Sequence, residues 1–234
     1  MHSTQLRESC TSSPNAPSVH DYDPEVEHQA LRASRDYFAT LASVPDRSLT
    51  HCSLHWSATP YRWASDCVAV GTTLPYHIVA GENTGGDATL FPGMSPALNA
   101  RELTDLHEAN VDYCASVYRR NSRGVAASMS AMAGAIPADF GTAPITPVLI
   151  EFMCAGAAAL CAAYGIDARD PQACYTHAEA AIWDGYFLGD EDDSRWDLAI
   201  LEPHAGDIAS LKRLVPATGD RLRARIHAYR QKLA

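Results

Sequence analysis

The 234-residue sequence lacks an excess of basic residues, a long uninterrupted apolar run and any CxxC pair. It carries 18 Lys and Arg against 28 Asp and Glu, a net charge of −10 with His neutral. Nucleic acids and anionic surfaces are bound by clustered positive charge, so we expect no nucleic-acid partner and no docking on an anionic membrane by charge. Hydrophobic residues make up 47% and charged residues 20%, which excludes a disordered chain and indicates a globular core.

Cysteine is present, but not with the spacing of a zinc ribbon or a thioredoxin site. The seven cysteines are an odd number, and several lie in apolar runs such as Phe152-Met-Cys-Ala155. A cysteine in such a run is usually a small buried hydrophobic residue, and free thiols indicate a reducing compartment. The first residues show no basic segment followed by an apolar stretch, as a secretory signal has. We therefore expect a cytoplasmic protein.

The most apolar segment, 147–164, is predicted to be a buried helix and not a membrane span. Glu151 interrupts it, and it is short for a bilayer. Thr146 is suited to cap its N-terminus, Pro147 to occupy its first turn and Gly165 to end it.

The rest of the chain mixes strands and helices without a regular βα repeat. Residues 1–23 are rich in Ser, Thr, Pro and His and predict a flexible N-terminal segment, and an N-terminal helix follows within 24–46. Strands are predicted at 49–56, 75–80, 88–91, 125–129 and 173–177, with a turn at 85–87 and a C-terminal helix at 220–233. This order predicts an α/β fold, with a central mixed β-sheet flanked by helices in a single domain over 47–234.

Two of the ten histidines stand out because each lies near the end of a predicted strand. His55 ends the first strand, whose alternation places His51 and Ser53 on the same face. His177 ends the last strand, and Asp197 follows further along the chain. Two imidazoles and one carboxylate with a free fourth position form a catalytic zinc arrangement. At each position taken alone, a buried structural histidine is the more common finding.

The short sequence motifs around these residues carry more information than the residues alone. In chain order they are His55-Trp-Ser-Ala-Thr-Pro60, Pro75-Tyr-His-Ile-Val79, the stretch 121–135 that opens with Asn121, Tyr175-Thr-His-Ala-Glu179 and Arg195-Trp-Asp197. Over residues 47–205 the chain thereby resembles the zinc-dependent N-acetylmuramoyl-L-alanine amidase family. That family includes bacteriophage lysozyme-amidases and shares its fold with peptidoglycan-recognition proteins. The resemblance implies a mixed sheet flanked by helices, with zinc in a cleft on one face.

The resemblance also implies roles for individual residues. It implies one Zn²⁺ per chain, with His55, His177 and Asp197 as the metal ligands. It implies Tyr76 and Arg195 as catalytic residues beside a zinc-activated water. Arg195 would stabilise the oxyanion of the attacked amide, and Tyr76 would orient the water or help protonate the leaving nitrogen.

Glu179 and three departures from the family pattern leave alternatives open. Glu179 either orients a metal ligand through a hydrogen bond or is a carboxylate at a helix N-terminus. Ser128 stands where many relatives have a Glu, and Ser116 where relatives often have a substrate-contacting His. The acidic run 190–193 borders the expected cleft and would repel the carboxylates of a peptidoglycan stem, unless it is a solvated surface loop.

The implied function is hydrolysis of the muramoyl-peptide amide of peptidoglycan. The departures keep open a second enzyme function, in which the same zinc scaffold acts on another amide by specialised-metabolite hydrolysis or acyl transfer. A third alternative is a non-catalytic module that binds muropeptides, which the intact ligand set disfavours. The expected partner is peptidoglycan, a muropeptide or another amide substrate, and the oligomeric state is left open. A phage-derived enzyme without a signal would reach the cell wall through a holin.

Overall fold

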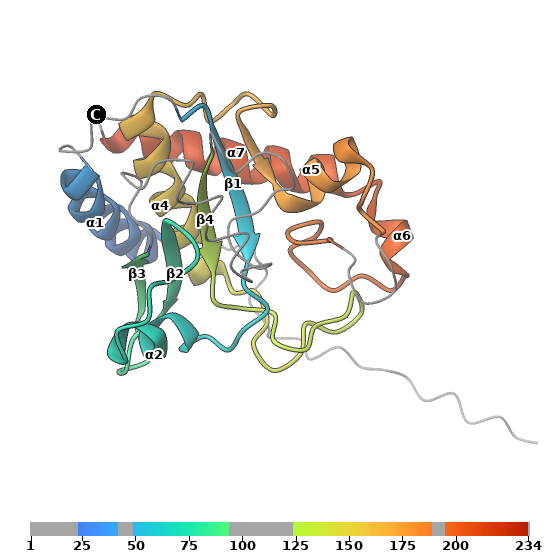
Figure 1. The fold of residues 1–234 in the computed structure, drawn as a ribbon, viewed down its shortest axis with the longest axis horizontal. Coiled ribbons are helices and arrows are strands. Elements are labelled where there is room, and N and C mark those ends of the chain that lie inside the picture. The colour runs from blue at the N-terminus through green and yellow to red at the C-terminus, as the bar shows by residue number, and fades with distance from the viewer. Residues whose placement is uncertain (1–22, 42–48, 94–123, 189–194, 234) are drawn as a thin grey trace, which may run out of the picture.

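A computed structural model describes residues 23–41, 49–93, 124–188 and 195–233. Five strands form one sheet: β1 (His51–Trp56), β2 (Ile78–Glu82), β3 (Ala88–Pro92), β4 (Gly124–Met129) and β5 (Cys174–Thr176). The strand order is β3-β2-β4-β1-β5 (Figure 1). β2, β4, β1 and β5 run parallel, and only β3 is antiparallel, as the hairpin partner of β2. The predicted α/β class, a mixed sheet flanked by helices in one domain, is confirmed.

The central helix α4 (Pro147–Tyr164) has the termini that the sequence predicts. The side chain of Thr146 accepts a hydrogen bond from the backbone N–H of Leu149 at 3.2 Å, and Pro147 lies in the first turn. Gly165 ends the helix with a left-handed φ of 69°, which a side chain would disfavour. The length and apolar composition of α4 would also suit a membrane span, but 72% of it is buried within the fold, as in a core helix.

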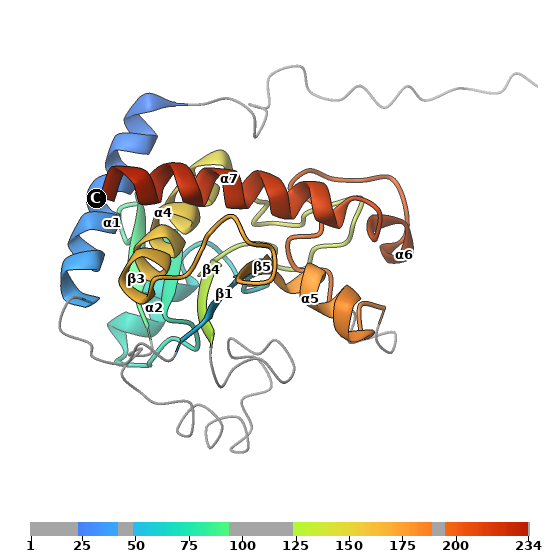
Figure 2. The ribbon, with the colours of Figure 1, turned by 90° about the horizontal axis from the view of Figure 1, so that it is seen from above.

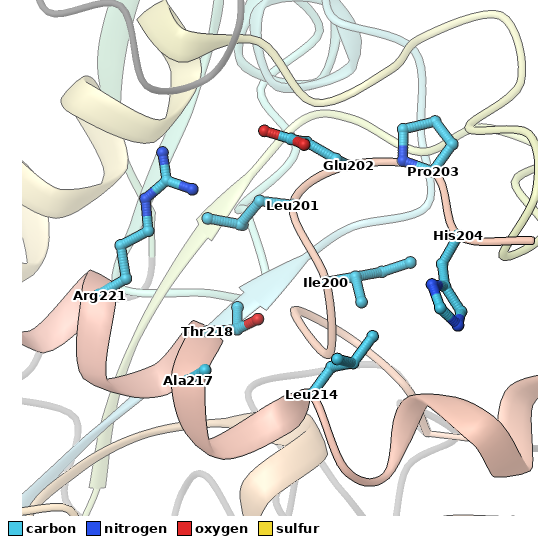
Figure 3. A pocket seen from close by; sticks show the side chains of 9 residues that line it. All are labelled: Ile200, Leu201, Glu202, Pro203, His204, Leu214, Ala217, Thr218 and Arg221. Carbon is cyan, nitrogen blue, oxygen red and sulfur yellow. The ribbon is translucent and has the colours of Figure 1, made fainter.

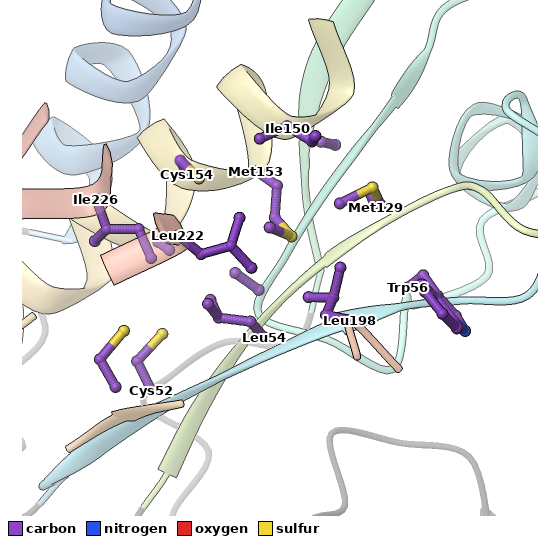
Figure 4. Close-up of a cluster of buried hydrophobic side chains, with 14 of the residues drawn as sticks. Cys52, Leu54, Trp56, Met129, Ile150, Met153, Cys154, Leu198, Leu222 and Ile226 are labelled. Carbon is purple, nitrogen blue, oxygen red and sulfur yellow. The ribbon is translucent and has the colours of Figure 1, made fainter. Parts of the chain in front are cut away.

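Close contact between α4 and the sheet depends on Gly156. A Cβ at that position would lie 3.2 Å from side-chain atoms of both Ile78 and Leu90, so the helix approaches β2 and β3 at a point without a side chain. The same face of the sheet contributes alternate residues of β1, β2 and β4 to one large core. Figure 4 shows part of this core, with Cys52, Leu54 and Trp56 spaced along β1, and with Met153 of α4 and Leu222 of the C-terminal helix over the middle of the strand.

The helices α1 (Pro24–Leu41) and α7 (Val215–Leu233) pack against α4 (Figure 2). Ser34 of α1 donates a hydrogen bond to the carbonyl of Ala155 at 2.5 Å, with both groups buried. Glu27, which is 8% exposed, pairs with Lys232 and lies 3.8 Å from Arg225 of α7. Polar bonds as well as apolar contacts therefore attach α1 to the domain.

Three helices differ from the expectation. α2 (Trp63–Ala69), α5 (His177–Asp184) and α6 (Ile208–Leu211) were not predicted, because each is short and two of them lie in polar sequence. α7 begins five residues before the predicted start at 220, since Pro216 fits the first turn of a helix, where its missing N–H is not needed. α2 packs on the face of the sheet opposite α4, over Tyr76 and Val79.

The described cysteines are free thiols, as expected. Four of them, Cys52, Cys154, Cys161 and Cys174, are completely buried in the core, which confirms their expected role as small hydrophobic residues. Cys10 and Cys114 lie outside the described residues. So do residues 1–22, the end of the predicted N-terminal helix after 41, Ser116 and the acidic run 190–193.

Removal of the α4 cap should destabilise the whole domain, because α4 contacts the sheet and two other helices. We expect Thr146→Ala to lower the free energy of unfolding by about 0.5–2 kcal/mol, measured by urea denaturation. Thr146→Ser keeps the capping oxygen and should stay close to the wild type. Equal losses in both variants would show that the methyl group, and not the cap, is what matters.

Candidate metal centre

The two histidines singled out by the sequence meet at the carboxyl edge of the sheet. β1 and β5 are parallel neighbours, with Leu54 opposite Thr176. The residues that follow this pair, His55 and His177, therefore lie at the same edge of the sheet. Their ring centroids are 4.8 Å apart. The sequence predicted that His177 ends a strand, and the structure shows instead that it is the first residue of α5. The exposed fractions are 2% for His55 and 6% for His177, so both rings are buried.

Asp197 reaches this edge from a loop that is tied to both histidine segments. Its carbonyl accepts a hydrogen bond at 3.1 Å from the N–H of Ala178, in the first turn of α5. The neighbouring Trp196 ring packs edge-on against Trp56, the neighbour of His55, with centroids 4.6 Å apart. Leu198 follows with a φ of +59°, a strained value for a leucine that this packing sustains.

The three side chains present their donor atoms to one point. Oδ2 of Asp197 lies 3.5 Å from Nδ1 of His55 and 3.4 Å from Nδ1 of His177. All three donors are within 4.8 Å of one another. Zinc bond lengths of about 2.0–2.2 Å in a tetrahedron place neighbouring ligand atoms roughly 3.3–3.5 Å apart. The buried group of His55, His177 and Asp197 can therefore hold a metal ion.

The charges of the group also suit a cation. The pKa of His55 is lowered to about 4, mainly by burial. Asp197 opposes this shift, while His177 and Arg195 contribute to it. The imidazole of His55 is therefore neutral at pH 7, the form that binds metal. Burial raises the pKa of Asp197, but the facing imidazoles outweigh it and hold that pKa well below its usual value. The group thus presents the negative charge of Asp197 and the neutral imidazole of His55 to its centre.

Tyr76 and Arg195, the two residues expected to be catalytic, lie beside this group. Tyr76 precedes β2, and its ring centroid is 5.4 Å from that of His55 at a tilt of 43°. The charge of Arg195 is close enough to lower the pKa of His55. The Arg195 N–H donates to the carbonyl of Phe187 at 3.3 Å, which ties its backbone to the loop after α5.

Three other polar residues lie near the group without belonging to it. His51 stacks on Tyr175 with ring centroids 5.7 Å apart, and Nδ1 of His77 accepts a hydrogen bond from the Ala126 N–H at 3.0 Å. Neither belongs to the metal group of the described residues. Ser128 pairs with His55 in the β1–β4 register and is completely buried, and its Oγ has no hydrogen-bond partner in the described part of the chain.

Glu179 has the helix role rather than a contact with a metal ligand. Its carboxylate accepts from the Thr176 N–H at 2.9 Å, while Thr176 caps the Glu179 N–H, which completes a capping box at the start of α5. Both carboxylate oxygens also bind Arg223 at 2.8 Å. Gly219 of α7 leaves room for this pair, since a Cβ there would overlap the carboxylate. Glu179 therefore supports His177 only by fixing the helix that His177 begins.

The sequence contained signals for two features that the prediction missed. Thr176-His-Ala-Glu179 has the spacing of a capping box and so marks a helix start at His177. Ser53 lies two residues before His55 on the same strand face, and its Oγ is 3.1 Å from Nε2 of His55. The alternation of β1 placed the two together, but only the structure shows that they touch.

A separate cavity of about 400 Å³ lies between the loop after Asp197 and the first turns of α7. Figure 3 shows its apolar side chains Ile200 and Leu214, with Arg221 and His204 at its edges. None of the metal-group residues lines this cavity.

No protein-family model, curated protein or solved structure matches this chain. A functional assignment therefore depends on the five sequence motifs and on the geometry around His55, His177 and Asp197.

The structural role of Glu179 predicts a large effect on stability. Glu179→Ala would leave Arg223 buried without its main partner, and we expect a loss of about 3–5 kcal/mol in urea denaturation. Asp220→Ala is the matched control: Asp220 binds the same guanidinium at 2.7 Å but is 76% exposed, so about 1 kcal/mol or less should be lost. Zinc loss from Glu179→Ala with little change in stability would instead support the ligand-orienting role.

Proposed function

We propose that the chain is a zinc-dependent amide hydrolase of the N-acetylmuramoyl-L-alanine amidase type, which cleaves the muramoyl-peptide amide of peptidoglycan. The observation that carries this proposal is the buried cluster of His55, His177 and Asp197, with donor separations of 3.4–3.5 Å between the carboxylate and each imidazole. Two nitrogens and one carboxylate oxygen, with a fourth position left over, are a ligand set typical of catalytic zinc.

Arg195, Tyr76 and the metal ligands would each have a separate role in amide cleavage. Zinc in such a site supplies Lewis acidity and a water whose pKa is lowered to about 7. Arg195 offers a permanent positive charge and hydrogen-bond donors to the oxygen of the attacked carbonyl, on which negative charge develops. Tyr76 offers a hydroxyl that orients the attacking water or donates a proton toward the leaving nitrogen. The burial of His55 and His177 excludes competing water and strengthens these interactions.

A second candidate is an amide other than peptidoglycan. It is favoured by Ser128, which stands beside His55 at the position where many members of the resembling family carry a glutamate. A buried hydroxyl does not replace a carboxylate as a general base. Mass spectrometry of digested sacculi, run beside a panel of small amides, separates the two candidates. A zinc-loaded protein that cleaves neither would support a muropeptide-binding module.

One zinc per chain should copurify with the protein and depend on each ligand. We expect His177→Ala to lose the metal in elemental analysis after dialysis and to keep its circular dichroism spectrum, because a core of this size does not need a metal to fold. His51→Ala is the control, since His51 lies on the same strand face outside the metal group, and it should keep full occupancy. Full zinc content in His177→Ala would contradict the ligand assignment.

Arg195 should act mainly in the transition state. We expect Arg195→Ala to lower kcat by about 10²–10³ with a smaller effect on KM, measured on soluble muropeptide fragments or on the amide that the screen identifies. Arg195→Lys keeps the charge and should retain more activity than the alanine variant. A loss confined to KM would show instead that Arg195 anchors a substrate carboxylate in the ground state.

A further inference from the structure

Ser53 makes a hydrogen bond to the metal group that neither the resemblance nor the expected mechanism includes. It lies on β1 two residues before His55, is 3% exposed, and is buried between β4 and β5 in the sheet. Its Oγ lies 3.1 Å from Nε2 of His55, on the side of the ring away from Asp197. His55 therefore has a partner at each ring nitrogen: the serine at Nε2 and the metal-group carboxylate at Nδ1.

The direction of this contact depends on what Nδ1 of His55 binds. With a metal on Nδ1, the proton of the neutral imidazole is on Nε2, and Ser53 Oγ accepts it while donating its own proton to the carbonyl of Val125, which lies 3.4 Å away. Without a metal, Nδ1 faces the Asp197 carboxylate, which can only accept, and Ser53 Oγ can donate to Nε2 instead. In both states the serine holds Nε2 and leaves Nδ1 on the side of the metal group.

From these contacts we infer that Ser53 is a positioning residue for the metal centre: by binding Nε2, it orients the ring of His55 so that Nδ1 is the metal ligand. The inference rests on the proposed function, because it gives the role of Ser53 toward the same metal. A hydrogen bond to the second nitrogen of a metal-binding histidine typically fixes the ring in this way, and its loss weakens metal binding about 10–100-fold.

Neighbouring residues show that the contact is specific. Ser128, directly opposite His55 on β4, has a buried Oγ that makes no hydrogen bond among the described residues. Among the described residues, Nδ1 of His177 faces the Asp197 carboxylate at 3.4 Å, and no group bonds to its Nε2. Of the two imidazoles in the metal group, His55 is thus the one that this hydrogen bond orients before a metal arrives.

The test measures the contact at Nε2 and the metal affinity separately on the full chain. In the metal-free protein at pH 7.5, two-bond ¹H–¹⁵N correlation spectra should show a changed Nε2 shift of His55 in Ser53→Ala, because that nitrogen loses its partner. Ser53→Ala should also raise the zinc Kd about 10–100-fold, measured by competition with a chromophoric chelator. Ser53→Thr keeps the hydroxyl and should restore both readouts toward wild type.

Ser34→Ala is the matched control for stability. Ser34 is also a buried serine whose hydroxyl donates to a backbone carbonyl, but it lies on α1, and its loss should leave the Nε2 shift of His55 and the zinc Kd unchanged. A Ser53→Ala variant with an unchanged Nε2 shift, or with an unchanged zinc Kd, would overturn the inference. If wild type binds no zinc, the proposed function fails, and the Nε2 shifts of wild type and Ser53→Ala still decide whether Ser53 holds the His55 ring.

Discussion

The parallel pairing of β1 with β5 is the constraint on which the candidate site depends. Parallel strands end at the same edge of a sheet, and this pairing places His55 and His177 next to each other although they are far apart in the sequence. Ligand sites in open α/β sheets commonly lie at this carboxyl edge. Every other feature of the site adds to this arrangement: the loop of Asp197, the ring of Tyr76 and the charge of Arg195 all approach the same two imidazoles.

Three supports hold the group from behind, and each acts on a different ligand. The hydrogen bond from Ser53 acts on the His55 ring. The capping box of Thr176 and Glu179 fixes the first turn of α5, where His177 lies. The hydrogen bond from Ala178 to the carbonyl of Asp197 joins that turn to the third ligand. Metal sites need such support because a metal binds more weakly when its ligands must be ordered at the same time as they bind.

The buried pair of Glu179 and Arg223 shows how stability and function are linked here. Arg223 comes from α7, which packs on α4 and so belongs to the main core, while Glu179 belongs to the helix that carries a candidate metal ligand. The pair attaches the site to the most extensively packed part of the domain. Gly219 is needed at the point of contact, since the carboxylate occupies the space that a side chain would fill.

The sequence by itself determined the class of the fold and the candidates for the site. Alternation in β1 placed His55 and Ser53 on one face and Cys52 and Leu54 on the core face, and the caps of α4 were readable because they depend on a few adjacent residues. Such local signals do not depend on distant parts of the chain. Even the start of α5 was readable in principle from its capping box.

Only the tertiary structure decided what those candidates touch. That Glu179 binds Arg223, that His51 stacks on Tyr175, and that Ser53 bonds to Nε2 of His55 all depend on which strands and helices become neighbours. A carboxylate or an imidazole is the same chemical group whether it binds a metal, another side chain or the backbone. Its partner is set by packing between segments that are remote in sequence, and no local pattern encodes that choice.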